Sequence, residues 1–237
     1  MKIFFENIRN GGSIDLIKKI PKDFDIVVLE EFQPCVKDKY EKILKLKGYT
    51  YFKGPDVTID RGICNSTYIA SKTQLSCKYK PKKIYKVKQF WEEVELNNRL
   101  FVLAVYVPCG NGCYSKYKKT IWDEIIVRAE LAVKQKQKLV IIGDFNTVTK
   151  GDYTGEPTSC ASYINKIKSL GFVDTWKRFN SNDEDRWTYI TQKGDKRRID
   201  YSFCSPELEN DIISAKHIHD FRLAGLTDHS AIAIELL

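Results

Sequence analysis

The chain has 237 residues, of which 43% are hydrophobic and 12% are aromatic. This composition excludes a disordered protein and is enough for one α/β domain spanning residues 1–237. The net charge is +8 at pH 7. A basic surface attracts phosphate-rich partners, but charge alone does not distinguish a nucleic-acid-binding protein from a lysine-rich solvated surface.

The chain has seven cysteines and three histidines, with no two pairs at zinc-finger spacing. Structural zinc is therefore not expected, and free thiols are typical of a reducing compartment. The apolar segment at the amino terminus is interrupted by Glu6 and is too short for a signal peptide. No apolar run has the length of a membrane span. We expect an intracellular monomer, in the cytoplasm or nucleus, without membrane association.

In the first half of the chain, short apolar runs alternate with two helical patterns. Apolar residues three or four apart indicate helices, and short β-branched or alternating runs indicate strands. We expect helices at 14–20 and 37–46. We expect strands at 3–5, 25–29, 49–52, 63–70, 86–95 and 100–107, with a turn at Asn97-Asn98.

In the second half, a Gly-rich loop at 108–114 precedes the predicted elements. We expect helices at 120–133, 162–170 and 208–214, and strands at 139–142, 187–191, 199–204 and 231–236. Strands outnumber helices, several strands are adjacent hairpins, and helices separate the groups. This order predicts an α/β protein in which two mixed β-sheets pack together with flanking helices outside, a four-layer α/β/β/α sandwich.

One motif places polar side chains directly after an apolar strand. An apolar strand ends at Gly143-Asp144-Phe145-Asn146, which places an acid and an amide at the mouth of a sheet. Phosphodiester hydrolysis needs an activated water, a cation that neutralises charge and help for the leaving oxygen. Magnesium prefers carboxylates and substrate oxygens as ligands. The alternative reading of this motif is an Asp that caps the end of a strand.

Three further fragments are ambiguous when each is taken alone. Thr227-Asp228-His229 precedes the last strand, and its alternative reading is a turn residue with a packed histidine. Asp200 lies in Arg198-Ile199-Asp200-Tyr201 and has the right type to orient a histidine ring. Glu30-Glu31 ends an apolar strand, where an acid is either a metal ligand or solvated.

The order and spacing of these fragments resemble the endonuclease/exonuclease/phosphatase superfamily, whose fold is the DNase I-like sandwich. The resemblance extends over almost the whole chain. Its blocks are Asn7, 25–31, Tyr106-Val107-Pro108, 143–146, 171–176, Trp187-Thr188-Tyr189, 198–201 and 227–229.

The resemblance implies a metal site that binds Mg²⁺, with Mn²⁺ as a substitute. Glu31 would be the principal ligand, Asn7 would lie beside it, and Asp228 would share the ion. Asn7 would also contact substrate. The superfamily's exonuclease III-like branch has an Asp two residues after this Asn, whereas this chain has Arg9. Metal affinity or geometry is therefore expected to differ.

The resemblance also implies catalytic residues. Asp144 would orient or deprotonate the attacking water, and Asn146 would hold the scissile phosphate. His229 would donate to a phosphate oxygen, with Asp200 holding its ring. Tyr106 would be a further catalytic residue, and it favours the exonuclease III-like branch because many other members have His at this position.

Other positions bear on the substrate. Abasic-site enzymes place an aromatic residue where this chain has Arg197. A pocket for a base-free sugar is therefore in doubt, and undamaged nucleic acid is favoured as the substrate. Arg61 and Asn65 are expected in a loop over the substrate. Trp187 and Tyr189 are read first as core residues and second as base-stacking platforms.

Three hypotheses follow. The first is a Mg²⁺-dependent nuclease related to AP endonucleases, with DNA favoured over RNA as its partner. The second keeps the fold but acts on a tyrosyl-DNA adduct, a lipid head group or an inositol phosphate. The third is a nucleic-acid-binding protein with an inactive site, motivated by Arg9.

Overall fold

The computed structural model describes residues 1–54, 65–76, 79, 81, 83–96, 99–153, 157–180, 184–191 and 193–237. Arg61, the expected turn at Asn97-Asn98 and the start of the strand expected at 63–70 lie outside these residues. None of the helices in the described part of the chain combines the length and the apolar character needed to cross a bilayer.

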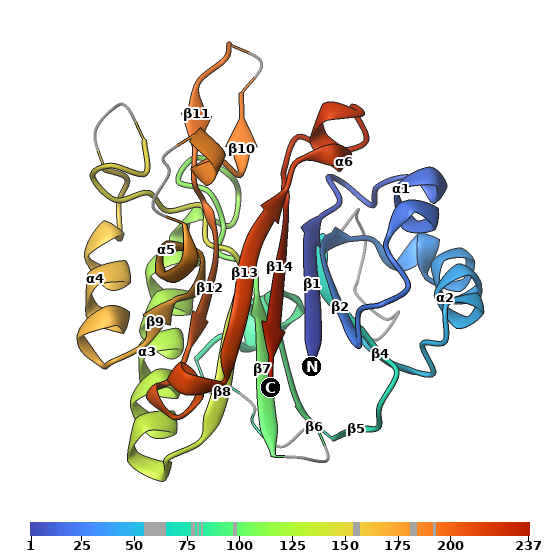
Figure 1. Ribbon diagram of the computed structural model, residues 1–237. Helices are drawn as coiled ribbons and strands as arrows, with labels where there is room; N and C mark the ends of the chain where they lie inside the picture. Colours follow the sequence, from blue (N-terminus) through green and yellow to red (C-terminus); the bar gives the residue numbers. More distant parts are fainter. Residues whose placement is uncertain are drawn as a thin grey trace.

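Two six-stranded mixed sheets form the centre of the molecule (Figure 1). The first sheet has the order β13 (Ile212–Ile218), β14 (Ala231–Leu236), β1 (Lys2–Asn7), β2 (Ile26–Phe32), β4 (Ser66–Ser71) and β3 (Tyr51–Lys53). The second has the order β5 (Leu75–Ser76), β6 (Trp91–Leu96), β7 (Leu100–Val105), β8 (Lys138–Asp144), β12 (Asp200–Cys204) and β9 (Val173–Asp174). A hairpin of β10 (Tyr189–Ile190) and β11 (Lys196–Arg197) projects above them.

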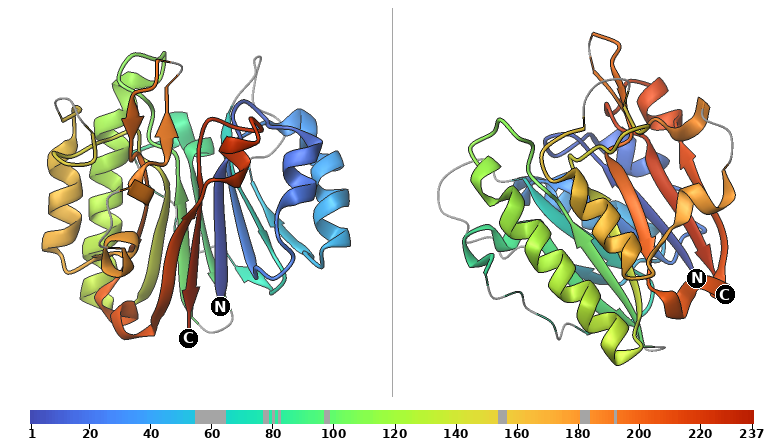
Figure 2. Two further views of the ribbon diagram at one scale, coloured as in Figure 1. Left: turned by 45° about the horizontal axis from the view of Figure 1, so that its top comes forward. Right: turned by 90° about the vertical axis from the view of Figure 1, so that its left-hand side faces the viewer.

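Helices cover the outer faces of both sheets (Figure 2). The first sheet is covered by α1 (Ile14–Lys19) and α2 (Lys37–Leu46), and the second by α3 (Lys118–Gln135) and α4 (Ala161–Ser169). Shorter helices are α5 (Thr175–Phe179) and α6 (Asp220–Leu223). Short 3₁₀ segments are η1 (Pro34–Val36), η2 (Tyr85–Phe90), η3 (Ser115–Tyr117), η4 (Glu184–Arg186) and η5 (Pro206–Asp211).

Buried apolar side chains form three layers, one between the sheets and one beneath each pair of helices. Phe5 of β1, Val102 of β7 and Ile142 of β8 belong to the central layer. Phe4, the neighbour of Phe5, points the other way into the layer under α1 and α2. Successive strand residues face opposite sides, so strands buried on both faces are apolar throughout. The expected four-layer sandwich of two mixed sheets with flanking helices is confirmed.

Two expected elements are wrong in part. The segment expected as a strand at 86–95 is the 3₁₀ turn η2 up to Phe90, and only β6 is extended. Ile84, Val87 and Phe90 are three apart and all enter the layer beneath α3, and this spacing matches the period of a 3₁₀ helix. The helix expected at 208–214 is instead η5 followed by β13, because pairing with β14 draws the chain into the sheet.

A buried ion pair attaches α3 to β6. Nε of Arg128 donates to Oε2 of Glu93 at 2.9 Å, and Nη2 donates to Oε1 at 2.8 Å. Both side chains are almost completely buried. Such a pair gains little over apolar residues, but losing one partner leaves an uncompensated buried charge.

We therefore expect Arg128→Met to lower the free energy of unfolding by about 3–5 kcal/mol, and Glu93→Leu to lower it by a similar amount. The double variant should be closer to the wild type than either single variant, because it leaves no buried charge. Urea unfolding of the four proteins measures this. Strictly additive losses would show that the two side chains do not act as a pair.

Candidate active site

A pocket of about 760 Å³ opens at the edge where β1, β2 and β8 end, the upper edge in Figure 1. Both parallel pairs, β1 with β2 and β7 with β8, point their carboxyl ends toward this edge. The sequence-predicted residues that line the pocket are Glu31, Tyr106, Asp144, Asn146, Asp228 and His229. Side chains as far apart in the sequence as Glu31 and His229 thus lie around one pocket.

A bulge in β2 decides which of two successive glutamates reaches the pocket. The pairing of β2 with β4 shifts register between Leu29 and Phe32, and Glu31 has a φ of +56°. Glu31 therefore faces the pocket while Glu30 is buried. Such bulges re-aim side chains next to functional sites.

The carboxylate of Glu31 is held by neutral donors. Oε2 accepts from the backbone N of Asn10 at 2.8 Å and from Nδ2 of Asn65 at 3.2 Å. Oε1 accepts from Nδ2 of Asn7 at 3.3 Å. Asn7 itself does not line the pocket and lies behind it, where it links Glu31 to Asp144. These bonds fix the carboxylate without cancelling its charge.

Gly143 allows β7 and β8 to approach closely beneath the site. A Cβ atom at this position would lie 2.0 Å from the carbonyl oxygen of Val105 and 2.8 Å from Oε1 of Glu30. Oε2 of Glu30 accepts from the backbone N of Asp144 at 2.7 Å. Burial, and then the charge of Asp144, hold the pKa of Glu30 well above its usual range.

Asp144 and Asn146 form a compact acid–amide pair. Oδ1 of Asp144 accepts from the backbone N of Asn146 at 2.8 Å, and Oδ2 accepts from its Nδ2 at 3.0 Å. Asn7 donates to the same Oδ2 at 3.1 Å. Burial, and then the charge of Asp200, raise the pKa of Asp144.

Asp200 lies directly opposite Asp144 in the β8–β12 register and binds His229. Nδ1 of His229 is 2.9 Å from Oδ2 and 3.1 Å from Oδ1 of Asp200. Burial by itself would lower the pKa of His229, but the Asp200 carboxylate raises it to about 10. This shift favours the imidazolium form, which donates hydrogen bonds at both nitrogens.

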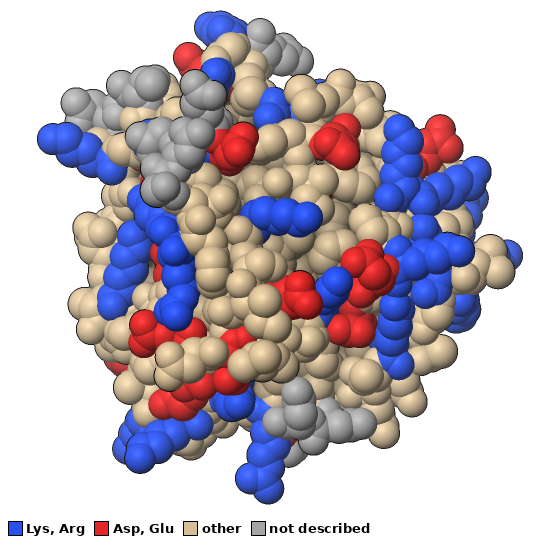
Figure 3. Space-filling view, in the orientation of Figure 1, with Lys and Arg blue, Asp and Glu red and all other residues tan. Residues whose placement is uncertain are grey.

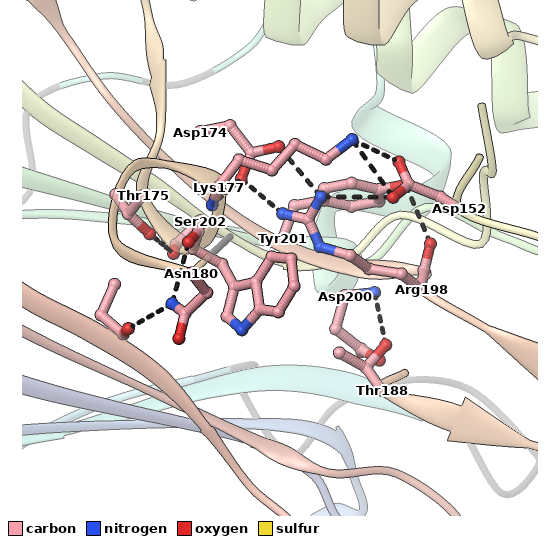
Figure 4. Close-up of polar contacts among 12 residues, drawn as sticks. Asp152, Asp174, Thr175, Lys177, Asn180, Thr188, Arg198, Asp200, Tyr201 and Ser202 are labelled. Atoms are coloured by element: carbon pink, nitrogen blue, oxygen red, sulfur yellow. Dashed lines mark hydrogen bonds and ion pairs between the residues drawn. The ribbon is translucent and has the colours of Figure 1, made fainter. Parts of the chain in front are cut away.

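A hydrogen-bonded network behind the site fixes the start of β12 (Figure 4). Oγ1 of Thr188 accepts from the backbone N of Ile199 at 3.1 Å and of Asp200 at 3.2 Å. Arg198 is completely buried and pairs with Asp174 through both terminal nitrogens. It also lies 3.6 Å from Asp152. These contacts hold the backbone before and at Asp200, whose carboxylate binds His229.

The aromatic residues divide between pocket and periphery. Tyr106 lines the pocket and packs on Phe90 at 5.1 Å between ring centroids, and burial raises its pKa. Tyr189 also lines the pocket, 4.9 Å from the ring of His229. Trp187 lies under Arg186 at 4.9 Å and is not a pocket residue. Neither Trp187 nor Tyr189 is fully buried, so their first reading as core residues is wrong.

Three basic residues line the pocket: Arg9, Lys118 and Arg197. Nζ of Lys118 donates to the carbonyl oxygen of Asn146 at 2.5 Å, and burial lowers the pKa of Lys118. Arg197 stacks over Tyr153 at 4.7 Å. The sequence did not single out Lys118, because it is one of several lysines in the run 116–119 and nothing local marks it as buried.

The model of the "Endonuclease/Exonuclease/phosphatase family" matches residues 7–229. The chain belongs to this family. The match includes all the residues that line the pocket between the sheets. A search of curated proteins found no match.

Solved structures support the fold assignment over the whole chain. A 3′–5′ exonuclease from Neisseria meningitidis has 19% identity and a TM-score of 0.79, and an AP endonuclease from Archaeoglobus fulgidus has 19% identity and a TM-score of 0.81. A 3′ phosphatase from Neisseria, bound to a product DNA hairpin, has 18% identity and a TM-score of 0.79. Each match covers 100% of this chain and 99% of the other.

The donor set of the pocket suits a divalent cation. In the described part of the chain, Asp144, Asp200 and His229 are the one group of three such side chains whose ligand atoms all lie within 4.8 Å of one another. Nδ1 of His229 is already engaged by the carboxylate of Asp200. Carboxylate and amide oxygens remain, and these suit Mg²⁺.

We expect Thr188→Val to lower the free energy of unfolding by about 2 kcal/mol, because two buried N–H groups lose their acceptor. Thr188→Ser keeps the hydroxyl and is the matched control. Urea unfolding of both variants tests this. An unchanged unfolding free energy in Thr188→Val would show that the hydroxyl does not stabilise these two N–H groups.

His217 gives a prediction about pH. Its ring stacks on Trp176 at 5.0 Å and its Nδ1 lies 2.8 Å from the carbonyl oxygen of Asp185. Burial and the nearby charge of Arg198 lower the pKa of His217 to about 3. The unfolded chain therefore takes up this proton first, and the contribution of the neutral ring is lost as pH falls from about 6.5 toward 3.

Wild-type protein should accordingly lose more unfolding free energy between pH 7.5 and pH 5 than His217→Gln, which does not titrate. Urea unfolding at both pH values gives the difference. Parallel pH profiles of the two proteins would contradict the lowered pKa.

Proposed function

We propose that this protein is a Mg²⁺-dependent phosphodiesterase that hydrolyses phosphodiester bonds of nucleic acid, with DNA favoured over RNA. The observation that carries the proposal is the convergence of two pairs on one pocket: Asp144 with Asn146, and His229 with Asp200. One pair is suited to activating water and the other to stabilising negative charge on the phosphate by a charged hydrogen-bond donor. Phosphodiester hydrolysis needs both.

Asp144 would orient the attacking water and accept its proton. Its buried carboxyl has a raised pKa, which makes it a stronger base than an exposed aspartate. The amide of Asn146 would hold the scissile phosphate beside it. The positive φ of Asn146, +43°, turns this residue back toward Asp144.

His229 would donate a hydrogen bond to a phosphate oxygen as negative charge develops. Asp200 occupies Nδ1, so Nε2 is the nitrogen available for substrate. A group with a pKa of about 10 remains charged throughout the reaction near neutral pH, so its main contribution is electrostatic. Tyr106 would add a neutral hydroxyl on the pocket wall, since its raised pKa keeps it protonated.

Glu31 and Asp228 would hold the magnesium ion, and Asn7, beside Glu31, would fix its carboxylate. When bound, the ion supplies positive charge for the phosphate oxygens and the leaving group. Mn²⁺ would be accepted in its place, since both ions suit oxygen ligands. The cation would also relieve the crowding of carboxylates around the pocket.

The pocket's charges favour a phosphate-bearing substrate. Arg9, Lys118 and Arg197 lie on its walls. On the face shown in Figure 3, Lys and Arg gather mainly along the right-hand side, with Asp and Glu among and beside them. One solved relative is a 3′ phosphatase bound to a DNA hairpin. Arg197 in the wall argues for a substrate with intact bases.

A second candidate is a nucleic-acid-binding protein without catalysis. It is favoured by the ion pair between Arg9 and Asp228, 3.7 Å apart. The other residues that hydrolysis needs are present, so we rank it below hydrolysis. Tyrosyl-DNA, lipid and inositol phosphate substrates are less favoured, because Tyr106 stands where many enzymes for such substrates have His.

We expect Asp144→Asn and His229→Ala each to reduce turnover by about 10²–10⁴-fold, because each removes a group acting in proton transfer or charge stabilisation. The assay is a panel of labelled single-stranded, double-stranded, abasic and RNA oligonucleotides with Mg²⁺, repeated with EDTA. Phosphotyrosyl oligonucleotide and sphingomyelin, added to the panel, test the tyrosyl-DNA and lipid substrates.

Asp23→Asn is the matched control, because Asp23 is exposed and pairs only with Lys2 across the surface in the described structure. Full activity of Asp144→Asn with an unchanged unfolding transition would show that the assigned site is wrong. Absence of turnover on every substrate, with retained nucleic-acid binding, would favour the non-catalytic candidate.

A further inference from the structure

The backbone of Arg9 is held by a hydrogen bond, whereas its guanidinium is partly exposed. It follows β1 with a φ of +51°, and its backbone N donates to Oδ1 of Asn7 at 3.0 Å. Its Nε lies 3.7 Å from Oδ2 of Asp228. The Arg9 side chain is 53% exposed and the Asp228 side chain 31% exposed. Both line the pocket.

This ion pair distinguishes Asp228 from Glu31. Glu31 is held by amide and backbone N–H groups, which are neutral, whereas Asp228 faces a full positive charge. A neutral donor moves aside from a carboxylate oxygen at little electrostatic cost. A guanidinium beside the same oxygen repels any cation that approaches it.

We propose, on the basis of the function proposed above, that Arg9 competes with the divalent cation for Asp228. The cation binds weakly to the free protein because it must approach within reach of this guanidinium. A phosphodiester entering the pocket draws Arg9 away from Asp228 and so strengthens cation binding. Arg9 is thus a positioning residue that couples the two ligands.

The geometry permits this exchange. Exposed ion pairs contribute little free energy, so the Arg9–Asp228 contact breaks easily. A guanidinium binds phosphate oxygens through two parallel N–H groups, and such bonds are stronger than the single Nε contact made to Asp228. Two ligands that each weaken the same internal contact assist one another's binding, and the coupling is reciprocal.

Calorimetric titration of the full chain with Mn²⁺ tests the competition. Arg9→Gln should bind Mn²⁺ about tenfold more tightly than wild type, because a positive charge close to a divalent cation is removed. Arg9→Lys keeps the charge and should stay within about threefold of wild type. Thermal unfolding in EDTA checks that each variant is folded.

Arg197→Gln is the matched control. It removes the same charge from the same pocket, but Arg197 stacks on Tyr153 and is not among the ion-pair partners of Asp228 in the described structure. Its Mn²⁺ affinity should change less than that of Arg9→Gln. Equal tightening in both variants would mean that the overall charge of the pocket, and not the contact with Asp228, sets the affinity.

A second titration, with dimethyl phosphate present in excess, tests the coupling. This phosphodiester carries no base or sugar, so the result does not depend on the substrate of the enzyme. The Mn²⁺ affinity of wild type should rise, and that of Arg9→Gln should rise less. An equal rise in both proteins would overturn the coupling, since the anion would then act through the cation alone.

The outcomes separate this inference from the proposed function. Equal Mn²⁺ affinity in wild type and Arg9→Gln, together with metal-dependent turnover, would overturn the role of Arg9 alone. No Mn²⁺ binding in any variant would overturn both. Tighter binding in Arg9→Gln without turnover on any substrate would support the competition and contradict the proposed hydrolysis.

Discussion

Two carboxylates, Asp144 and Asp200, stand opposite each other on neighbouring strands and are almost completely buried. Like charges at such a position are stable only if other groups compensate them. His229, in the segment that leads into β14 of the first sheet, supplies a positive charge to both. The site therefore forms only when the two sheets are packed together. Its buried carboxylates favour the binding of a cation and of hydrogen-bond donors.

The surroundings hold these groups in place through contacts that do not themselves enter the pocket. Thr188 fixes the backbone of Asp200, and Glu30 fixes that of Asp144. The buried pair of Arg198 and Asp174 anchors the start of the same strand. Contacts of this kind pre-organise a site, because they leave little freedom to be lost when substrate binds. Arg9 differs from these buried residues, since its exposed guanidinium can move from Asp228 to another anion.

The sequence predicted elements best where one local pattern was decisive. The expected helix at 37–46 and the last strand at 231–236 have the boundaries found in the structure. Helical spacing also located α3. Prediction failed at 86–90 and at 212–214, where period-three packing and pairing with β14 override local propensity. Strands as short as β5 and β9 carry too few residues to form a pattern.

The sequence by itself determined the family and the sandwich of two sheets, and it named several residues that line the pocket, because ordered motifs at strand ends survive as a pattern along the chain. Only the tertiary structure decided how these residues meet. A bulge turned Glu31 into the pocket, Lys118 became buried beside Asn146, and Arg9 reached Asp228. Such contacts join residues far apart in sequence, and no local rule of spacing specifies them.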